Sequence, residues 1–179
     1  MAEDAYLLET DRLKLRPFES GDTGLLYGLH SDVQVMRYVG NGVQTQEKVL
    51  QCFNRCQEHQ AQYGFSMWAV FEKTTQAFVG RAGLIHLDQT SDIEVGYVLH
   101  RDFWGKGYAT ELANALVSWG FSALGLDKIT AIAVPENTAS RHVMEKIGMR
   151  YVRDDVFYGT AVAYYELENN LRKKKVIFG

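Results

Sequence analysis

The sequence predicts an α/β fold in which one mixed, mostly antiparallel sheet is covered by helices on both faces. Strand-like runs joined by short turns dominate the chain and favour antiparallel neighbours. One amphipathic helix stands between two such runs, which indicates a parallel crossover. The length of 179 residues, with 46% hydrophobic and 23% charged residues, suits one globular core. We therefore expect a single domain over residues 1–179.

The N-terminal segment is expected to form a strand and a short helix. Leucines alternate with basic residues over Leu8–Arg16, as in a half-buried strand. A helix over Glu19–Leu29 follows, with Ser20 or Asp22 as its N-cap.

A longer helix is expected from Thr45, a suitable N-cap, to Tyr63, with Gly64 ending it. Its buried stripe would contain Val49, Phe53, Cys56 and Gln60. Cys52, Cys56 and His59 share one face, but a closed zinc site needs four ligands in a fixed geometry. We therefore expect no metal site and interpret Cys56 as a small packed hydrophobe.

Three consecutive strands are expected in the middle of the chain, at Phe65–Glu72, Ala77–Leu87 and Asp92–Leu99. Lys73–Gln76 joins the first two as a hairpin turn, and Asp88–Ser91 joins the next two. Such short polar connections predict antiparallel neighbours.

The period then changes to that of a helix, followed by a strand, a short helix and a hairpin. The helical stripe consists of Ala109, Leu112, Ala113, Leu116, Val117 and Gly120. Lys128–Val134 is the strand expected to run parallel to the Asp92–Leu99 strand. Ser140–Lys146 is the short helix, with Gly148 in a left-handed end position. Arg150–Tyr158 and Ala161–Asn169 form the final hairpin.

The glycine turn Trp104–Thr110 is the most informative segment, because it joins a strand to an amphipathic helix. The start of a helix carries N–H groups without intrahelical partners and a partial positive charge. Gly105 and Gly107 would let a phosphate approach those groups closely, so a pyrophosphate is the expected ligand. A tight turn without any ligand is the alternative interpretation.

Other phosphate-binding loops fit this turn poorly. The dinucleotide-binding fingerprint needs a third glycine where Thr110 stands. The P-loop needs Ser or Thr directly after Gly-Lys, where Gly107 stands.

A second informative segment, Asn137–Gly148, follows the parallel strand. Asn137 or Thr138 suits a helix N-cap, and Val143, Met144 and Ile147 would form the buried stripe of the helix. Capping and packing explain most of this segment but not Ser140 in its first turn.

Together the two segments resemble the GNAT superfamily of N-acetyltransferases, and more narrowly its branch of ribosomal-protein N-terminal (alanine/serine) acetyltransferases, the RimJ/RimL-like branch. The resemblance begins at Leu8–Pro17, includes Ile93–Leu99, and continues through Trp104–Glu111 and Asn137–Gly148. It implies the GNAT fold, a single N-acetyltransferase domain and acetyl-coenzyme A as cofactor. One position departs from the family pattern, because Asp102 stands where the family has Gln or Arg.

The resemblance also implies the cofactor-binding residues. Backbone N–H groups from Gly105 to Ala109 and the Thr110 hydroxyl would hold the pyrophosphate of coenzyme A. The strand near Val98 and Leu99 would pair with the pantetheine amides, with a bulge expected at Gly96. Asn137 would contact the pantetheine arm. The expected cofactor-binding set is therefore Val98, Leu99, Gly105, Lys106, Gly107, Tyr108, Ala109, Thr110 and Asn137.

The expected reaction is direct transfer of the acetyl group to an amine, and it needs a base and a thiol partner. Many relatives carry a Tyr as the acid for the thiol where Met144 stands, so we expect Ser140 to serve the departing thiol. Glu94 is the expected base, through water, with a solvent-facing strand carboxylate as the alternative. Glu111 is a weaker candidate base, since the helix dipole already explains it. A strand N–H near Val98 would meet the developing oxyanion.

The remaining aromatic side chains are assigned more simply. Trp68, Trp104 and Trp119 are expected in the core. His86, at the end of a strand, could face the acceptor. The other histidines, at 30, 59, 100 and 142, are expected at the surface or in local contacts.

The acceptor remains open at this stage. A peptide α-amino group has a pKa of about 7.7–8.0 and is neutral far more often at pH 7 than a lysine amine, which favours an N-terminal substrate. The alternatives are a small amine, such as an antibiotic or polyamine, and a non-catalytic acyl-coenzyme A sensor. Acceptor contacts are expected from Val33–Thr45 and the last hairpin.

Charge and composition set the expected partners. A net charge of −3 offers no global basic surface for nucleic acid. The one basic cluster, Arg172–Lys175, is expected to be a solvated tail. An acidic N-terminus and the lack of long apolar runs predict a cytoplasmic protein away from membranes. It would be a monomer or homodimer.

Overall fold

The computed structural model describes residues 6–170 as one sheet with four α-helices around it. The strands are β1 (Leu8–Glu9), β2 (Leu13–Arg16), β3 (Met67–Glu72), β4 (Phe78–His86), β5 (Ile93–Leu99), β6 (Lys128–Ala133), β7 (Arg150–Phe157) and β8 (Thr160–Glu168). The helices are α1 (Thr23–His30), α2 (Gln46–Tyr63), α3 (Tyr108–Ser122) and α4 (Thr138–Lys146), with short 3₁₀ turns at Ser20–Asp22, Met36–Tyr38 and Arg101–Phe103.

The sheet has the order β1-β2-β3-β4-β5-β6-β8-β7, and all neighbours are antiparallel except β5 and β6. This confirms the predicted mixed fold and the crossover through α3. Within residues 6–170, β5 and β6 pair only at Glu94 and Thr130. The two strands therefore diverge beyond Glu94, and one edge of β5 is left open.

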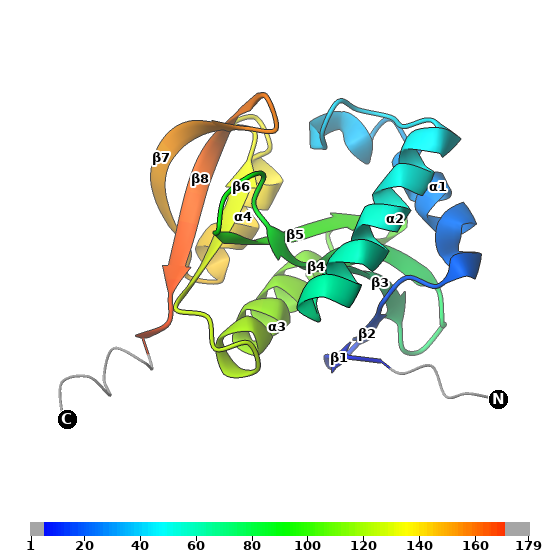
Figure 1. Cartoon of the computed structure of the whole chain (residues 1–179), viewed down its shortest axis with the longest axis horizontal. Helices are drawn as coiled ribbons and strands as arrows, with labels where there is room; N and C mark the ends of the chain where they lie inside the picture. The colour runs from blue at the N-terminus through cyan, green and yellow to red at the C-terminus, as the bar shows by residue number, and fades with distance from the viewer. Residues whose placement is uncertain (1–5, 171–179) are drawn as a thin grey trace.

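Two helix pairs cover the sheet. Helices α1 and α2 pack together, and so do α3 and α4. Figure 1 shows α1 and α2 beside β1–β4, while β6, β7 and β8 lean away on the other side of β5. The largest hydrophobic cluster joins the sheet to α3, with Trp68, Leu112 and Leu116 fully buried in it. A smaller cluster joins α2 to β3. The two clusters place the sheet between the two helix pairs.

Several local predictions are confirmed. Thr45 caps α2 by accepting a hydrogen bond from the Lys48 N–H, and Gly64 ends the helix in the left-handed region at φ 78°. Asn137 caps α4 through the Ser140 N–H, and Gly148 follows at φ 87°.

Other local predictions were wrong. The strand expected over Leu8–Arg16 is a hairpin of β1 and β2, because the Thr10 hydroxyl accepts a hydrogen bond from the Leu13 N–H and closes a turn. Asp22 precedes α1 but makes no side-chain cap, since its carboxylate pairs with Arg16 instead. The bulge expected at Gly96 is missing from the even register of β4 and β5. Instead, β5 separates from β6, because the pairing of these two strands ends at Glu94.

Two aromatic side chains also depart from the prediction. Trp104 is 49% exposed and lies outside the core, because its indole N–H donates to the Leu99 carbonyl at the sheet edge. His30 is fully buried, held between Gln44 and Arg81. Arg172–Lys175 lie outside the described residues. Among residues 6–170, no helix is both long and apolar enough to cross a membrane.

Candidate active site

A groove of ≈ 530 Å³ opens along the free edge of β5 and leads to the start of α3. It is lined by parts of β5, the glycine turn, α4 and the segment after α1. The residues expected to bind the cofactor that line it are Val98, Leu99, Gly105, Gly107, Tyr108, Ala109, Thr110 and Asn137, and Ser140 joins them. The structure thus brings together residues separated by about forty positions in sequence.

The backbone of β5 divides its hydrogen bonds between the two sides of the strand. Bonded pairs alternate in an antiparallel ladder, and the bonds that flank this one join His100 to Val79 and Leu87 to Asp92. The backbone N–H and C=O groups of even-numbered β5 residues therefore bond to β4. Those of odd-numbered residues point the other way, toward β6 and the groove. Thr130 and Trp104 confirm this, since they donate to the carbonyls of Ile93 and Leu99.

This alternation refines the expected backbone contacts. The Val98 N–H faces β4, so Val98 contributes its side chain to the groove rather than its amide. The Leu99 carbonyl is occupied by Trp104. The Tyr97 N–H and carbonyl and the Leu99 N–H are the backbone groups that remain for a ligand.

The glycine turn ends in an open helix start. Gly105 and Gly107 both have left-handed backbone conformations, with φ of 73° and 80°. Gly107 is the N-cap of α3 and supplies no side-chain cap. The N–H groups of Tyr108, Ala109 and Thr110 thus have no partner within the helix and face the groove as an anion site. The 15 residues of α3 add a helix dipole directed at the same point.

A side-chain clamp from the N-terminal hairpin holds this turn. Arg12 donates through Nη1 to the Lys106 carbonyl at 2.9 Å and through Nε to Glu111 at 2.7 Å. The Thr10 hydroxyl donates to the same carboxylate at 2.5 Å. Burial alone would raise the pKa of Glu111, but the Thr10 and Arg12 bonds outweigh it and lower the pKa. Glu111 is thus a tether and an unsuitable base.

Two residues expected to bind cofactor direct their side chains elsewhere. The Lys106 ammonium lies over the Phe103 ring, 5.2 Å from its centroid, and Lys106 does not line the groove. The Tyr108 ring is buried in the core, and its hydroxyl donates to Glu72. Both residues contribute backbone alone. Within residues 6–170, Arg37 and Lys146 are the cations that line the groove.

Ser140 has a partner that the sequence reasoning missed. Its Oγ shares a hydrogen bond of 3.0 Å with the Tyr97 hydroxyl, which also reaches the Ser140 carbonyl. Burial raises the pKa of Tyr97 to about 12, so the phenol is protonated at neutral pH and can donate. Met144 is buried in the core and does not reach the groove. No spacing in the sequence indicates this contact, because Tyr97 on β5 and Ser140 on α4 meet only in the fold.

Glu94 lies on β5 beside the point where the sheet divides, but its side chain is not part of the cofactor groove. Burial raises the pKa of its carboxyl to about 7, while Arg81 and a hydrogen bond of 3.5 Å from the Tyr158 hydroxyl act in the opposite direction. Such a carboxyl exchanges protons near neutral pH.

Tyr158 comes from the tip of the last hairpin and is locked to the loop after β4. Its N–H donates to the Asp88 carboxylate at 2.9 Å, and the Asp88 N–H donates to the Tyr158 hydroxyl at 2.8 Å. Both residues are non-glycine residues with positive φ, 51° and 47°. Strained pairs of this kind persist where the surrounding structure fixes them, and they are frequent at functional sites.

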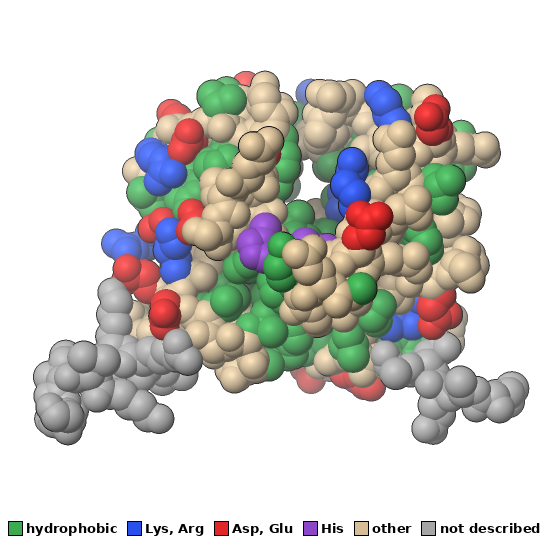
Figure 2. Space-filling view, viewed as in Figure 1, with side chains coloured by type: hydrophobic (Ala, Val, Ile, Leu, Met, Phe, Trp, Pro, Cys, Tyr) green, Lys and Arg blue, Asp and Glu red, His purple; other side chains and the backbone are tan. Residues whose placement is uncertain are grey.

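His59 on α2 and His86 at the end of β4 form a histidine pair. The His59 Nδ1–H donates to the Phe65 carbonyl at 2.6 Å, so its Nε2 accepts from the His86 Nδ1–H at 3.0 Å. In Figure 2 the molecule is hollowed between the α1–α2 half and the β7–β8 half, with histidine side chains on the rim of the hollow. We call the region around Glu94, which the Tyr158 hydroxyl contacts and which lies in the field of Arg81, the acceptor cleft.

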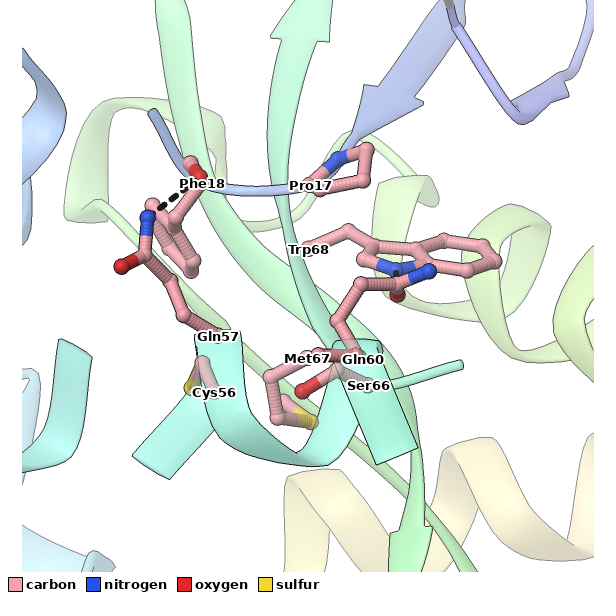
Figure 3. Close-up of a pocket in the computed structure, with 9 residues that line it drawn as sticks. Pro17, Phe18, Cys56, Gln57, Gln60, Ser66, Met67 and Trp68 are labelled. Carbon is pink, nitrogen blue, oxygen red and sulfur yellow. Dashed lines mark hydrogen bonds between the residues drawn. The ribbon is translucent and has the colours of Figure 1, made fainter. Parts of the chain in front are cut away.

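A smaller cavity of ≈ 260 Å³ lies apart from both, between α2 and β3. Figure 3 shows Cys56 and Met67 on its wall, with Gln60 accepting a hydrogen bond from the Trp68 indole. Cys56 belongs to the α2–β3 hydrophobic cluster, in line with its prediction as a packed residue.

An open strand edge, a glycine turn and an uncapped helix start together define an acyl-coenzyme A-dependent transferase. The chain belongs to the GNAT family, since the model described as "Acetyltransferase (GNAT) domain" matches residues 12–150. Its relatives include the Bacillus subtilis (strain 168) protein YkkB, 35% identical over 162 residues, or 89% of this chain and 94% of YkkB. The uncharacterized N-acetyltransferase YnaD of the same organism is 33% identical over 80% of this chain and 82% of its own length.

The solved structures agree with this assignment. A GNAT-family acetyltransferase from Bacillus anthracis superposes with a TM-score of 0.78 at 30% identity, over 90% of this chain and 97% of that protein. The protein is therefore an N-acetyltransferase that uses acetyl-coenzyme A.

The groove fits that cofactor on physical grounds. A Cβ added at Gly105 would meet nothing within 4 Å, so a phosphate can approach the turn. Free N–H groups stand at one end of the groove, and an open strand edge runs along it for amides to pair with.

Proposed function

We propose that this enzyme acetylates a primary amine that enters the acceptor cleft, and that its preferred amine is a protein or peptide N-terminus. One observation carries the proposal. Glu94, a carboxyl with a pKa of about 7, stands on β5 at the point where β6 parts from it, just outside a groove suited to coenzyme A that runs along the same strand. Cofactor and base can thus meet at the point where β5 and β6 part.

The N–H groups at the start of α3 would hold the pyrophosphate. Arg37 or Lys146 could pair with the remaining phosphate charge of the cofactor. The Tyr97 and Leu99 backbone and the Asn137 side chain would hold the pantetheine arm. Acetyl-coenzyme A supplies the thioester whose acetyl group is transferred. The Tyr97 N–H is the donor placed to meet charge on the carbonyl oxygen.

Proton movement is assigned to this chain's own residues. Ionised Glu94 takes the proton of the ammonium or attacking amine, directly or through water, and Tyr158 orients the carboxylate. A bond forms between the amine nitrogen and the acetyl carbon, and the bond from that carbon to sulfur breaks. Ser140, backed by the Tyr97 phenol, donates a hydrogen bond or proton to the departing sulfur.

The pKa of Glu94 favours an α-amino acceptor. An α-amino group with a pKa of about 7.7–8.0 lies close to a base of pKa about 7, whereas a lysine amine near 10.4 lies far above it. Both acceptor types occur among the similar proteins. Spermidine N(1)-acetyltransferase of Escherichia coli (strain K12) is 26% identical over 76% of this chain. A ribosomal-protein-serine acetyltransferase of Vibrio cholerae shares the fold at TM-score 0.75 and 20% identity.

The RimJ/RimL-like branch and a cytoplasmic location are part of this proposal. Both cysteines are free thiols, which suits a reducing compartment. A single domain over residues 1–179, acting as monomer or homodimer, completes it.

Thiol release from acetyl-coenzyme A, followed with a panel of amines, tests the proposal. The panel holds peptides with free and blocked N-termini, a lysine peptide with a blocked N-terminus, spermidine and an aminoglycoside. We expect turnover with free N-termini and loss of it on blocking. Turnover confined to spermidine or the aminoglycoside would contradict the peptide acceptor, and Glu94→Gln serves as the catalytic control.

A further inference from the structure

Arg81 is a half-buried cation in the acceptor cleft to which the mechanism assigns no role. It lies on β4, and its Nε donates to the Nε2 of His30 at 3.0 Å. Its two terminal nitrogens make no hydrogen bond to any described residue. Other Arg and Lys residues do form ion pairs, but no carboxylate of residues 6–170 pairs with Arg81.

The partner that holds Arg81 is uncharged. His30 is fully buried, and burial, with the field of Arg81, lowers its pKa to about 4. A neutral imidazole that accepts at Nε2 carries its proton on Nδ1, which donates to the Gln44 side chain at 3.0 Å. The Gln44 N–H in turn donates to the His30 carbonyl. This chain of contacts fixes the guanidinium without neutralising it.

The sheet register places Arg81 relative to the base. Arg81 lies opposite Val98, Gly83 opposite Gly96, and Ile85 opposite Glu94. Side chains two residues apart on a strand share a face, so Glu94, Gly96 and Val98 follow one another along one face of β5. A Cβ at Gly96 would meet only the Met67 side chain, at 3.6 Å or beyond. A base therefore stands at one end of this face and a cation at the other, with Gly96 and the flexible Met67 side chain between them.

The field of Arg81 reaches its neighbours. It opposes the burial that raises the pKa of Glu94. A hydrogen bond from Cys56 lowers the pKa of the Cys52 thiol against the effect of burial, and the Arg81 and Arg55 cations act in the same direction as that bond. A guanidinium without a carboxylate partner among residues 6–170 makes this end of the cleft unfavourable for a polyamine and favourable for an anion.

We propose that Arg81 binds a carboxylate of the acceptor, so that the preferred acceptors carry an anionic side chain next to the amine. The inference rests on the proposed N-acetyl transfer and specifies its substrate class. A guanidinium presents a planar pair of N–H donors that matches a carboxylate in two parallel bonds. With the amine over Gly96 and directed to Glu94, an acidic side chain at the first or second peptide position would extend toward Arg81.

Matched acceptors test this specificity. Peptides that differ only by Glu, Gln or Lys at the second position are compared, with free glutamate and glutamine as the small-molecule arm. For the wild type we expect kcat/KM about 10-fold or more higher for the Glu peptide than for the Gln peptide, from one charge-assisted hydrogen bond. A preference seen only among the free amino acids would assign the carboxylate to a small acceptor and overturn the peptide form of the proposal.

Variants of Arg81 attribute the preference to this residue. We expect Arg81→Gln to bring kcat/KM for the Glu and Gln peptides within about 2-fold of each other, through KM, with any change in kcat shared equally by the two peptides. Arg81→Lys should keep part of the preference, and Arg150→Gln, which removes one exposed cation elsewhere, should keep all of it. A preference that survives Arg81→Gln, or that favours the Lys peptide in the wild type, would overturn the inference. Thermal unfolding checks that each variant folds.

Binding separates this inference from the proposed function. Calorimetric titration of the coenzyme A-loaded protein with the same peptides needs no turnover. One outcome is that the Glu peptide binds more tightly than the Gln peptide and loses that advantage in Arg81→Gln, even though no amine releases thiol. In that case the proposed peptide acceptor is wrong, and the carboxylate site at Arg81 is supported. Equal binding of the two peptides contradicts the carboxylate site.

Discussion

The cofactor groove and the acceptor cleft, which both border β5, are built from different parts of the chain. On the groove side, the backbone supplies most contacts through the glycine turn, the start of α3 and the odd-numbered amides of β5. On the acceptor side, side chains supply them, and they come from α1, β4, β5 and the last hairpin. A backbone-built site tolerates most side-chain changes except those that alter the path of the chain. A side-chain site changes specificity with single substitutions, which is how one fold serves many acceptors.

The strongest test of this comparison is to alter the backbone-built side. Val in place of Gly105 or Gly107 must adopt a left-handed conformation and fill the approach to the helix start. We expect coenzyme A affinity to fall by roughly 100-fold or more, since strain and a lost anion contact act together. Isothermal titration calorimetry measures it.

Gly64→Val is the matched control, because Gly64 has a similar φ of 78° and open space around it but lies at the end of α2. It should lose stability and keep affinity for coenzyme A. Unchanged affinity in both groove variants would refute the assignment of the pyrophosphate site.

The acceptor side should respond in catalysis rather than in cofactor binding. Glu94→Gln is expected to lower kcat by about 100-fold, which is typical of a lost general base, with the KM for acetyl-coenzyme A unchanged. Because the ionised form is the active base, wild-type kcat should fall as pH decreases through about 7. The variant should lose that limb and keep only the titration of the acceptor amine. A wild-type profile without a limb near 7 would contradict the role of Glu94.

The sequence predicted the fold well, because periodicity and turn chemistry are local. The caps at Thr45 and Asn137, the end at Gly64 and the crossover through α3 are each decided within a few residues. The hairpin within Leu8–Arg16 was missed, because alternation continues through a turn closed by a single hydroxyl at Thr10. Trp104 was misplaced, because composition alone does not show that a sheet edge offers a carbonyl to its indole.

The site was predictable in unequal parts for the same reason. The glycine turn and Asn137 are local signals, and they line one groove as expected. Tyr97, Tyr158 and Arg81 are contacts between elements far apart in sequence, so no spacing rule indicates them. The identity of the acceptor depends on these distant contacts.

The Tyr97–Ser140 pair combines features of both regions, since it lines the cofactor groove but acts through side chains in the chemical step. We expect Ser140→Ala and Tyr97→Phe each to lower kcat by about 10-fold, the size of one hydrogen bond. The double variant should lose little more than either single variant, because the two groups act as one unit. Steady-state rates at saturating acetyl-coenzyme A measure this. Independent, multiplicative losses would show that the two hydroxyls act separately.

The smallest expected effect concerns the clamp that holds the backbone-built side in place. Arg12→Gln removes the bonds to Glu111 and to the Lys106 carbonyl, and we expect coenzyme A affinity to fall by only about 3-fold, because half-exposed ion pairs contribute little. Arg12→Lys distinguishes two causes. If Arg12 acts through its charge on the pyrophosphate, Lys restores affinity and the salt dependence of binding. If it acts by positioning the turn, Lys fails like Gln, since an ammonium cannot donate in the same fork to both acceptors. The geometry favours positioning, because the guanidinium nitrogens already engage the turn and α3.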